Sequence, residues 1–87
     1  MWVSNKSIYL TNSVNSGISN EIRGLTATND LWRIAGGATT SNAGYLEIAT
    51  ADDWSEPIYV RQYSGTFVTL KRTATLLDGS GNTEFPV

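Results

Sequence analysis

The sequence predicts an all-β protein made of short antiparallel strands joined by tight turns. Only 16% of its 87 residues are charged, and Thr, Ser, Asn and Gly, which favour strands and turns over helices, are abundant. In several short segments apolar residues recur at every second position, as expected when one face of a strand is covered. Turn-forming residues separate these segments at intervals of roughly ten residues, a spacing typical of an all-β module.

The first half of the chain contains four predicted strands with alternating apolar residues. They are Ser7–Thr11, Ile18–Arg23, Leu31–Ala35 and Tyr45–Thr50. The last has the clearest alternation, with Leu46 and Ile48 on one face. We expect the pair Gly36-Gly37 to end the third strand, because glycine weakens the interior of a strand.

The second half contains three further predicted segments. They are Ile58–Tyr63, Phe67–Arg72 with an extended continuation to Leu77, and Thr83–Phe85. In the first of them Ile58 and Val60 alternate with Tyr59, Arg61 and Tyr63. The glycine-rich stretch at 78–82 predicts a tight turn, because Asp-Gly and Gly tolerate positive φ.

The size and composition of the chain favour assembly with other chains. A domain this small buries only about 60% of the surface of its unfolded chain, so its stability as a monomer is marginal. The chain has no cysteine and no histidine, which excludes disulfides, cysteine-based zinc sites and the commonest general base. Oligomerisation is then the leading source of additional stability.

Charge and hydropathy argue against nucleic acid and membrane partners. The net charge is −2, from six basic and eight acidic residues, whereas nucleic-acid binders usually carry a basic field. No apolar run approaches the roughly 20 residues of a membrane helix. The first residues, Met1–Ser4, lack the pattern of a signal peptide. Together with the abrupt end Glu84–Val87 they indicate an excised fragment.

Four segments between residues 29 and 85 carry a resemblance to a known family. They are Asn29–Ile34, Gly44–Asp52, Glu56–Tyr63 and Arg72–Thr83. Through these segments the chain resembles a module of the long tail fibres of enterobacterial phages and prophages, whereas residues 1–28 fit more loosely. The resemblance implies a homotrimeric, non-enzymatic structural segment, 1–87, joined to neighbouring fibre segments in the virion. Such fibres are made in the host cytoplasm and contribute to host attachment by linking the baseplate to a receptor-binding tip.

A trimer would place apolar strand residues in its interface. We expect packing around a threefold axis to bury four residues and to protect strand edges. These four are Leu46, Ile48, Ile58 and Val60. Arg33 and Arg61 then either face solvent or pair with Glu47 or Glu21 of an adjacent chain.

Three aromatic residues are candidates for a glycan or partner contact. Trp54 lies in a polar turn and is the best of them, whereas Tyr59 and Tyr63 lie in a strand, where Tyr59 in particular is expected to serve packing. These residues support an alternative function, a module that binds bacterial surface polysaccharide.

Catalysis, cofactors and metals have little support in the sequence. Without histidine or cysteine no nucleophilic triad is possible. A pair of carboxylates would allow a second alternative, a polysaccharide-cleaving enzyme resembling tailspikes, but no spacing identifies such a pair. Asp52, Asp53 and Glu56 share one turn without the ligand spacing of a calcium loop, so we favour a solvated turn over a cation site. No cofactor is predicted.

Overall fold

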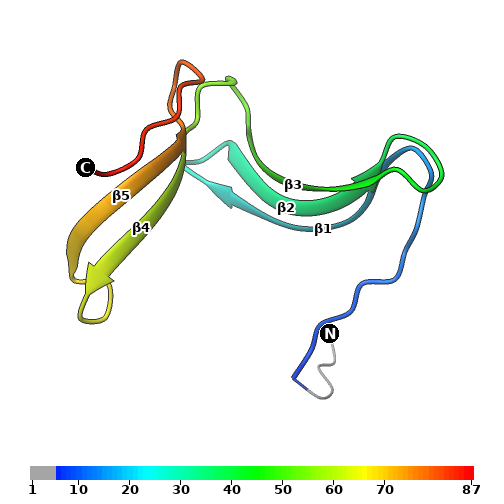
Figure 1. Cartoon of the computed structure of the whole chain (residues 1–87), viewed down its shortest axis with the longest axis horizontal. Coiled ribbons are helices and arrows are strands. Elements are labelled where there is room, and N and C mark those ends of the chain that lie inside the picture. Colours follow the sequence, from blue (N-terminus) through cyan, green and yellow to red (C-terminus); the bar gives the residue numbers. More distant parts are fainter. Residues whose placement is uncertain (1–5) are drawn as a thin grey trace. The chain divides into compact units, whose positions relative to one another are not determined.

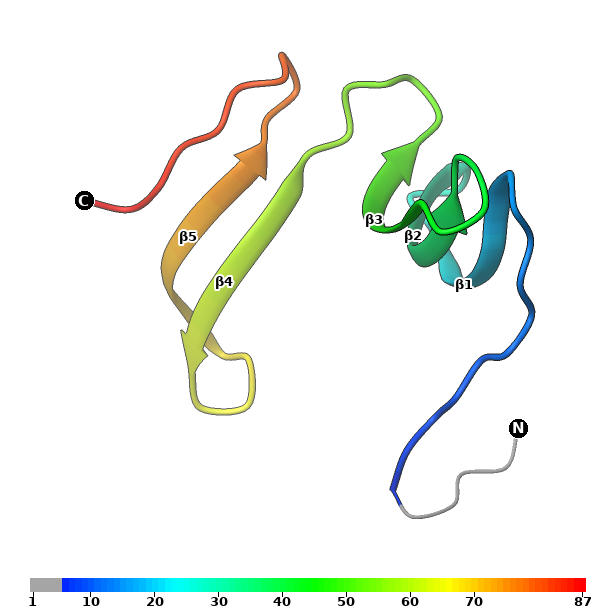
Figure 2. The same ribbon diagram turned by 45° about the vertical axis from the view of Figure 1, so that its right-hand side comes forward.

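The computed structural model describes residues 6–87, which form five β-strands and no helix. The strands are β1 (Gly17–Thr26), β2 (Asp30–Ala38), β3 (Gly44–Ala51), β4 (Ile58–Ser64) and β5 (Thr69–Leu77). In chain order β1, β2 and β3 form an antiparallel three-stranded sheet, and β4 and β5 form a separate antiparallel pair (Figures 1 and 2). The predicted all-β class is confirmed. Within residues 6–87 no helix can span a membrane. The interpretation of Met1–Ser4 concerns residues outside this range.

The predicted strand Ser7–Thr11 is wrong, because this segment is not one of the five strands. The chain that follows meets the outer edge of β1 through side chains instead of a backbone ladder. The Asn12 side-chain amide donates to the Ser19 carbonyl at 2.9 Å, and the Asn20 amide donates to the Asn12 carbonyl at 2.9 Å. Alternation alone predicted a strand here, but a strand also needs a partner for its backbone groups.

Glycine does not end β2, contrary to the prediction from the pair Gly36-Gly37. The strand continues through both glycines to Ala38. A Cβ atom on Gly37 would lie 2.7 Å from the Tyr45 hydroxyl and 2.8 Å from the Gly17 carbonyl oxygen. Gly37 therefore permits a close approach of neighbouring groups within the sheet, which is the other common role of glycine in a strand.

The hairpin of β4 and β5 begins its second strand later than predicted. Gly65 and Phe67 both have positive φ, at 69° and 57°, so the turn extends over Phe67 and β5 starts at Thr69. The Val68 amide closes this turn by donating to the Ser64 carbonyl at 3.2 Å. The register shifts at two points along the pair, between Ile58 and Tyr59 and between Gln62 and Tyr63.

The third predicted segment of the second half, Thr83–Phe85, is reduced to one bridge. The Thr75 and Glu84 backbones exchange two hydrogen bonds, of 2.7 and 2.8 Å, and the ladder goes no further. Pro86 offers no N–H group with which to extend it. The predicted turn before this bridge is confirmed, because the Asp78 carboxylate accepts the backbone N–H groups of Ser80 and Asn82 at 2.8 and 2.9 Å.

The chain divides into two compact units with almost no buried core. The first unit comprises the described residues up to Arg23 and Arg33–Ile48, and the second comprises Gly24–Trp32 and Ala49–Val87. Among residues 6–87 only Ala35 is buried, at 2% exposure. In the second unit the Trp32 indole covers Gly24 so closely that a Cβ there would overlap the ring. Apolar packing within the chain is therefore local.

Candidate functional site

A cluster of four charged side chains crosses the three-stranded sheet, and we call it the ionic ladder: Glu21, Arg23, Arg33 and Glu47. Arg33 on β2 donates to Glu47 on β3 at 2.8 Å and to Glu21 on β1 at 3.3 Å, and Arg23 pairs with Glu21 at 2.9 Å. The hydrogen bond to Glu47, with the nearby charges, raises the pKa of Arg33 above its ordinary value. Of the two roles expected for Arg33, pairing with Glu21 and Glu47 occurs, but within one chain.

Within the first unit, the members of the ionic ladder lie on one side of the sheet, and this allows the residues of the other side to be assigned. Successive side chains of a strand point to opposite faces, so the residues next to the ladder members in sequence lie on the other side. In the first unit this side carries five large aliphatic residues. We call it the apolar face: Ile18, Ile22, Ile34, Leu46 and Ile48.

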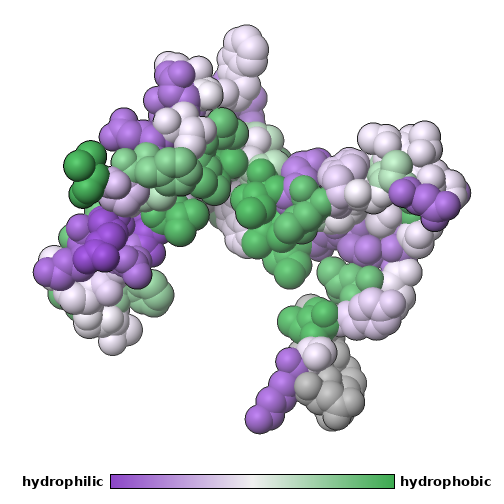
Figure 3. All heavy atoms as spheres, viewed as in Figure 1, coloured by the Kyte–Doolittle hydropathy of each residue, from purple (hydrophilic) through white to green (hydrophobic). Residues whose placement is uncertain are grey.

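Three residues of the apolar face are more open to solvent than Glu21, Arg33 and Glu47 of the ionic ladder, whereas the fourth ladder residue, Arg23, is 53% exposed. The side chains of Glu21, Arg33 and Glu47 are 27–30% exposed. In contrast, 45% of Ile34, 73% of Leu46 and 54% of Ile48 are exposed. Hydrophobic residues accordingly appear at the molecular surface (Figure 3). A free soluble domain normally shows the opposite order, with charges outside and aliphatic groups covered.

The interface residues predicted from the sequence fall on two different strands. Leu46 and Ile48 lie two residues apart on β3 and belong to the apolar face. Ile58 and Val60 lie two residues apart on β4, where Ile58 is half-buried and Val60 is 56% exposed. Three members of the apolar face were missed as interface residues, although the same alternation marks them: Ile18, Ile22 and Ile34.

The three aromatic candidates have different surroundings. On β4 the Arg61 guanidinium lies 4.0 Å from the Tyr59 ring centroid, and Tyr63 packs edge-on against Phe67 with ring centroids 5.6 Å apart. Trp54 is 99% exposed, so its ring contacts essentially nothing. The structure therefore does not gather these residues into one aromatic platform.

The loop that presents Trp54 has an unusual backbone. Asp52 and Trp54 have φ values of 140° and 60°, which residues other than glycine rarely adopt. Two interactions close this loop: the Asp53 N–H donates to the Glu56 carboxylate at 3.1 Å, and the Thr50 hydroxyl donates to the Glu56 carbonyl at 2.8 Å. The loop holds the indole away from both flanking strands.

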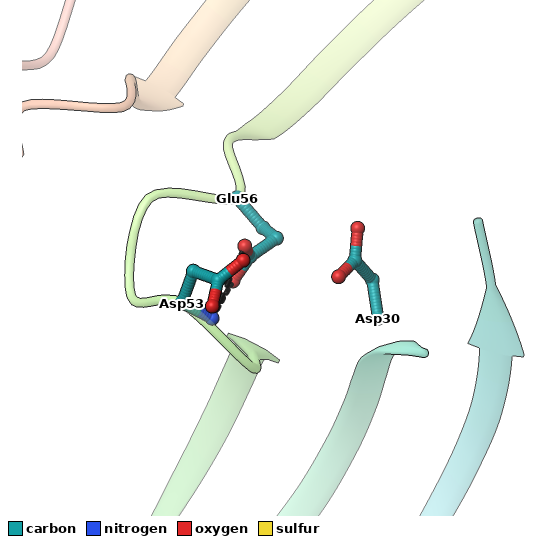
Figure 4. A group of neighbouring side chains, drawn as sticks. All are labelled: Asp30, Asp53 and Glu56. Carbon is teal, nitrogen blue, oxygen red and sulfur yellow. Dashed lines mark hydrogen bonds between the residues drawn. The ribbon is translucent and has the colours of Figure 1, made fainter. Parts of the chain in front are cut away.

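A second feature of this loop is an acidic cluster of Asp30, Asp53 and Glu56. Their carboxylate oxygens lie within 4.8 Å of one another, with Asp30 reaching them from the start of β2 (Figure 4). Asp52, which was grouped with this turn in the sequence, is not a member. Asp30 was missed because it is remote in sequence, although the antiparallel neighbours β2 and β3 place the start of one strand beside the end of the other. Part of the Glu56 carboxylate is already used by the Asp53 N–H.

Comparison of the chain with protein families, with curated proteins and with solved structures finds no match.

Proposed function

We propose that this chain is a non-enzymatic structural segment of a trimeric phage tail fibre that contributes to host attachment. The observation that carries the proposal is the missing core: Ala35 alone is buried among the described residues. Folding of a small domain depends on removing apolar surface from water. A chain that covers so little by itself needs other chains to cover the rest.

Large apolar side chains are exposed within each unit. In the first unit 73% of Leu46 and 54% of Ile48 are exposed, and in the second unit 80% of Phe67 and 79% of Val68. Exposed apolar groups of this kind mark surfaces that other chains cover.

The fibre role itself draws support from the resemblance. The four segments that carry it overlap β2, β3, β4 and β5 and the turn after β5. The resemblance thus falls on the β-structured part of the chain, and it implies a threefold rod joined to neighbouring segments in the virion. The ionic ladder joins three strands through cross-strand pairs, which stabilise a sheet.

The proposal is tested by measuring the solution mass with light scattering on a sizing column. We expect a mass near three times the 9.5 kDa of one chain. A well-folded monomer at all concentrations would contradict the proposal, because the chain would then be stable without covering its apolar surface.

Trp54 favours one alternative, the binding of bacterial surface polysaccharide. A fully exposed indole on a strained loop suits stacking against the apolar face of a sugar ring. This alternative predicts saturable binding to host lipopolysaccharide that is lost in Trp54→Ala and kept in Phe67→Ala. Absence of binding to any host surface fraction would exclude it.

A further inference from the structure

We propose that the apolar face of the three-stranded sheet is the surface through which copies of this chain associate. Each copy places Ile34, Leu46 and Ile48 against its neighbours, with Ile18 and Ile22 extending the contact along β1. The inference rests on the proposed function, which requires assembly, and adds the surface that assembly buries. The hairpin of β4 and β5 then lies outside the main contact.

The distribution of charge makes the apolar face suitable for meeting a second copy of itself. Within the first unit the charged residues of β1, β2 and β3 are the four members of the ionic ladder, all on the opposite side. Identical surfaces repel each other when they carry a net charge, and this face carries none. Asn20 is the polar residue on this face, and its side-chain amide donates to the Asn12 carbonyl. Because this amide already has an acceptor, burying the face does not leave it without one.

The hairpin is less suited to the same role. Val60 pairs with Ala74, and Gln62, two residues further along β4, pairs with Arg72. Because alternate residues of a strand share a face, Arg72 lies on the same side of the hairpin as Val60. Two copies meeting there would bring like charges together or bury an unpaired guanidinium, and both are unfavourable. The aromatic rings of β4 are already engaged by Arg61 and Phe67.

Thiol labelling tests which surface the assembly buries. The chain has no cysteine, so a single introduced thiol is the sole reactive one. Leu46→Cys places it on the apolar face and Val68→Cys places it in the hairpin turn. The two sites are matched in the free chain, at 73% and 79% exposure. Each variant is mixed with an excess of wild-type chain, so that the substitution itself does not prevent assembly.

We expect the thiol of Leu46→Cys to react with a maleimide at least about tenfold more slowly than that of Val68→Cys in the assembled state, because burial restricts access. Dilution below the assembly range should make the two rates equal. Equal rates in an assembly of confirmed mass would overturn the inference and leave the proposed function standing. A monomeric mass for the wild-type chain would overturn both.

Discussion

The two sheets of this protein differ in how charged and apolar side chains are distributed over their sides. In the three-stranded sheet Arg33 joins residues 12 and 14 positions away in sequence, and the charged strand residues of the first unit gather on one side. In the hairpin the principal side-chain contacts are local, between Tyr59 and Arg61 and between Tyr63 and Phe67. The part of the first sheet that lies in the first unit is thereby left with an uncharged aliphatic side, whereas Asp30 and Trp32 continue that side of β2 in the second unit. The hairpin has charged and apolar residues on the same sides.

This difference indicates where association is favourable. The register of the three strands brings their alternating apolar residues to one surface, and the ion pairs of Arg33 join the strands on the opposite side. Local pairs stabilise a hairpin without producing such a surface. The exposure of Leu46 and Ile48 in the single chain is what the proposed assembly would remove.

The largest expected effect on association comes from placing a charge on the apolar face. Ile48→Glu should weaken association at least about a hundredfold, since an unpaired charge is costly in an apolar interface. Val60→Glu is the matched variant in the hairpin, because the two residues are 54% and 56% exposed. Its effect should be much smaller. Sedimentation equilibrium measures both, and equal losses would remove the distinction between the sheets.

An intermediate effect is expected from removing the cation of the ionic ladder. Arg33→Met leaves Glu21 and Glu47 without the guanidinium that joins them, and the melting temperature should fall. Because Glu47 raises the pKa of Arg33, the stabilisation is complete at neutral pH and is lost only as pH rises above the ordinary range of arginine.

The hairpin supplies the control for this variant. Arg61→Met removes a guanidinium whose recorded partner is the Tyr59 ring, so its melting temperature should fall less than that of Arg33→Met. Thermal unfolding followed by circular dichroism compares the two. A larger fall in melting temperature for Arg61→Met would show that the ionic ladder does not contribute more to stability than the contact of Arg61 with Tyr59.

The smallest effect concerns the turn after β5. The N–H groups of Asn82 and Ser80 hold the pKa of Asp78 below its ordinary value. A carboxylate with a lowered pKa stabilises the fold above its ordinary pKa, and this contribution is lost as pH falls through the lowered value. We expect the Ser80 and Asn82 amide resonances to shift in acid in the wild type. They should stay unchanged over that range in Asp78→Asn, which keeps the acceptor oxygen and does not titrate; the same shift in both proteins would contradict this.

Much of the strand structure is predictable from the sequence because alternation marks it directly. The predicted Tyr45–Thr50 and Ile58–Tyr63 agree with β3 and β4 to within one residue at each end. Ser7–Thr11 failed because alternation does not show how far a backbone ladder extends, and in this segment only Ser7 is bridged. The pair Gly36-Gly37 failed because glycine serves both turns and close contacts, and only the position of Tyr45 decides between them.

The candidate surface was predictable in part for the same reason. Leu46 and Ile48 were identified because they lie in the clearest alternating segment. Ile22 and Ile34 alternate too, but joining them to Leu46 on one side of a sheet requires the strand order and the in-chain pairing of Arg33. The acidic cluster likewise needed the pairing of β2 with β3 to bring Asp30 to the turn.

We propose that this chain depends on other copies to cover its apolar surface. The melting temperature, measured as a function of protein concentration, tests this dependence. When folding and association are coupled, the melting temperature rises with concentration, and we expect such a rise over the whole accessible range. A cooperative transition at one temperature, independent of concentration, would mean that a single chain is stable alone and would contradict the account.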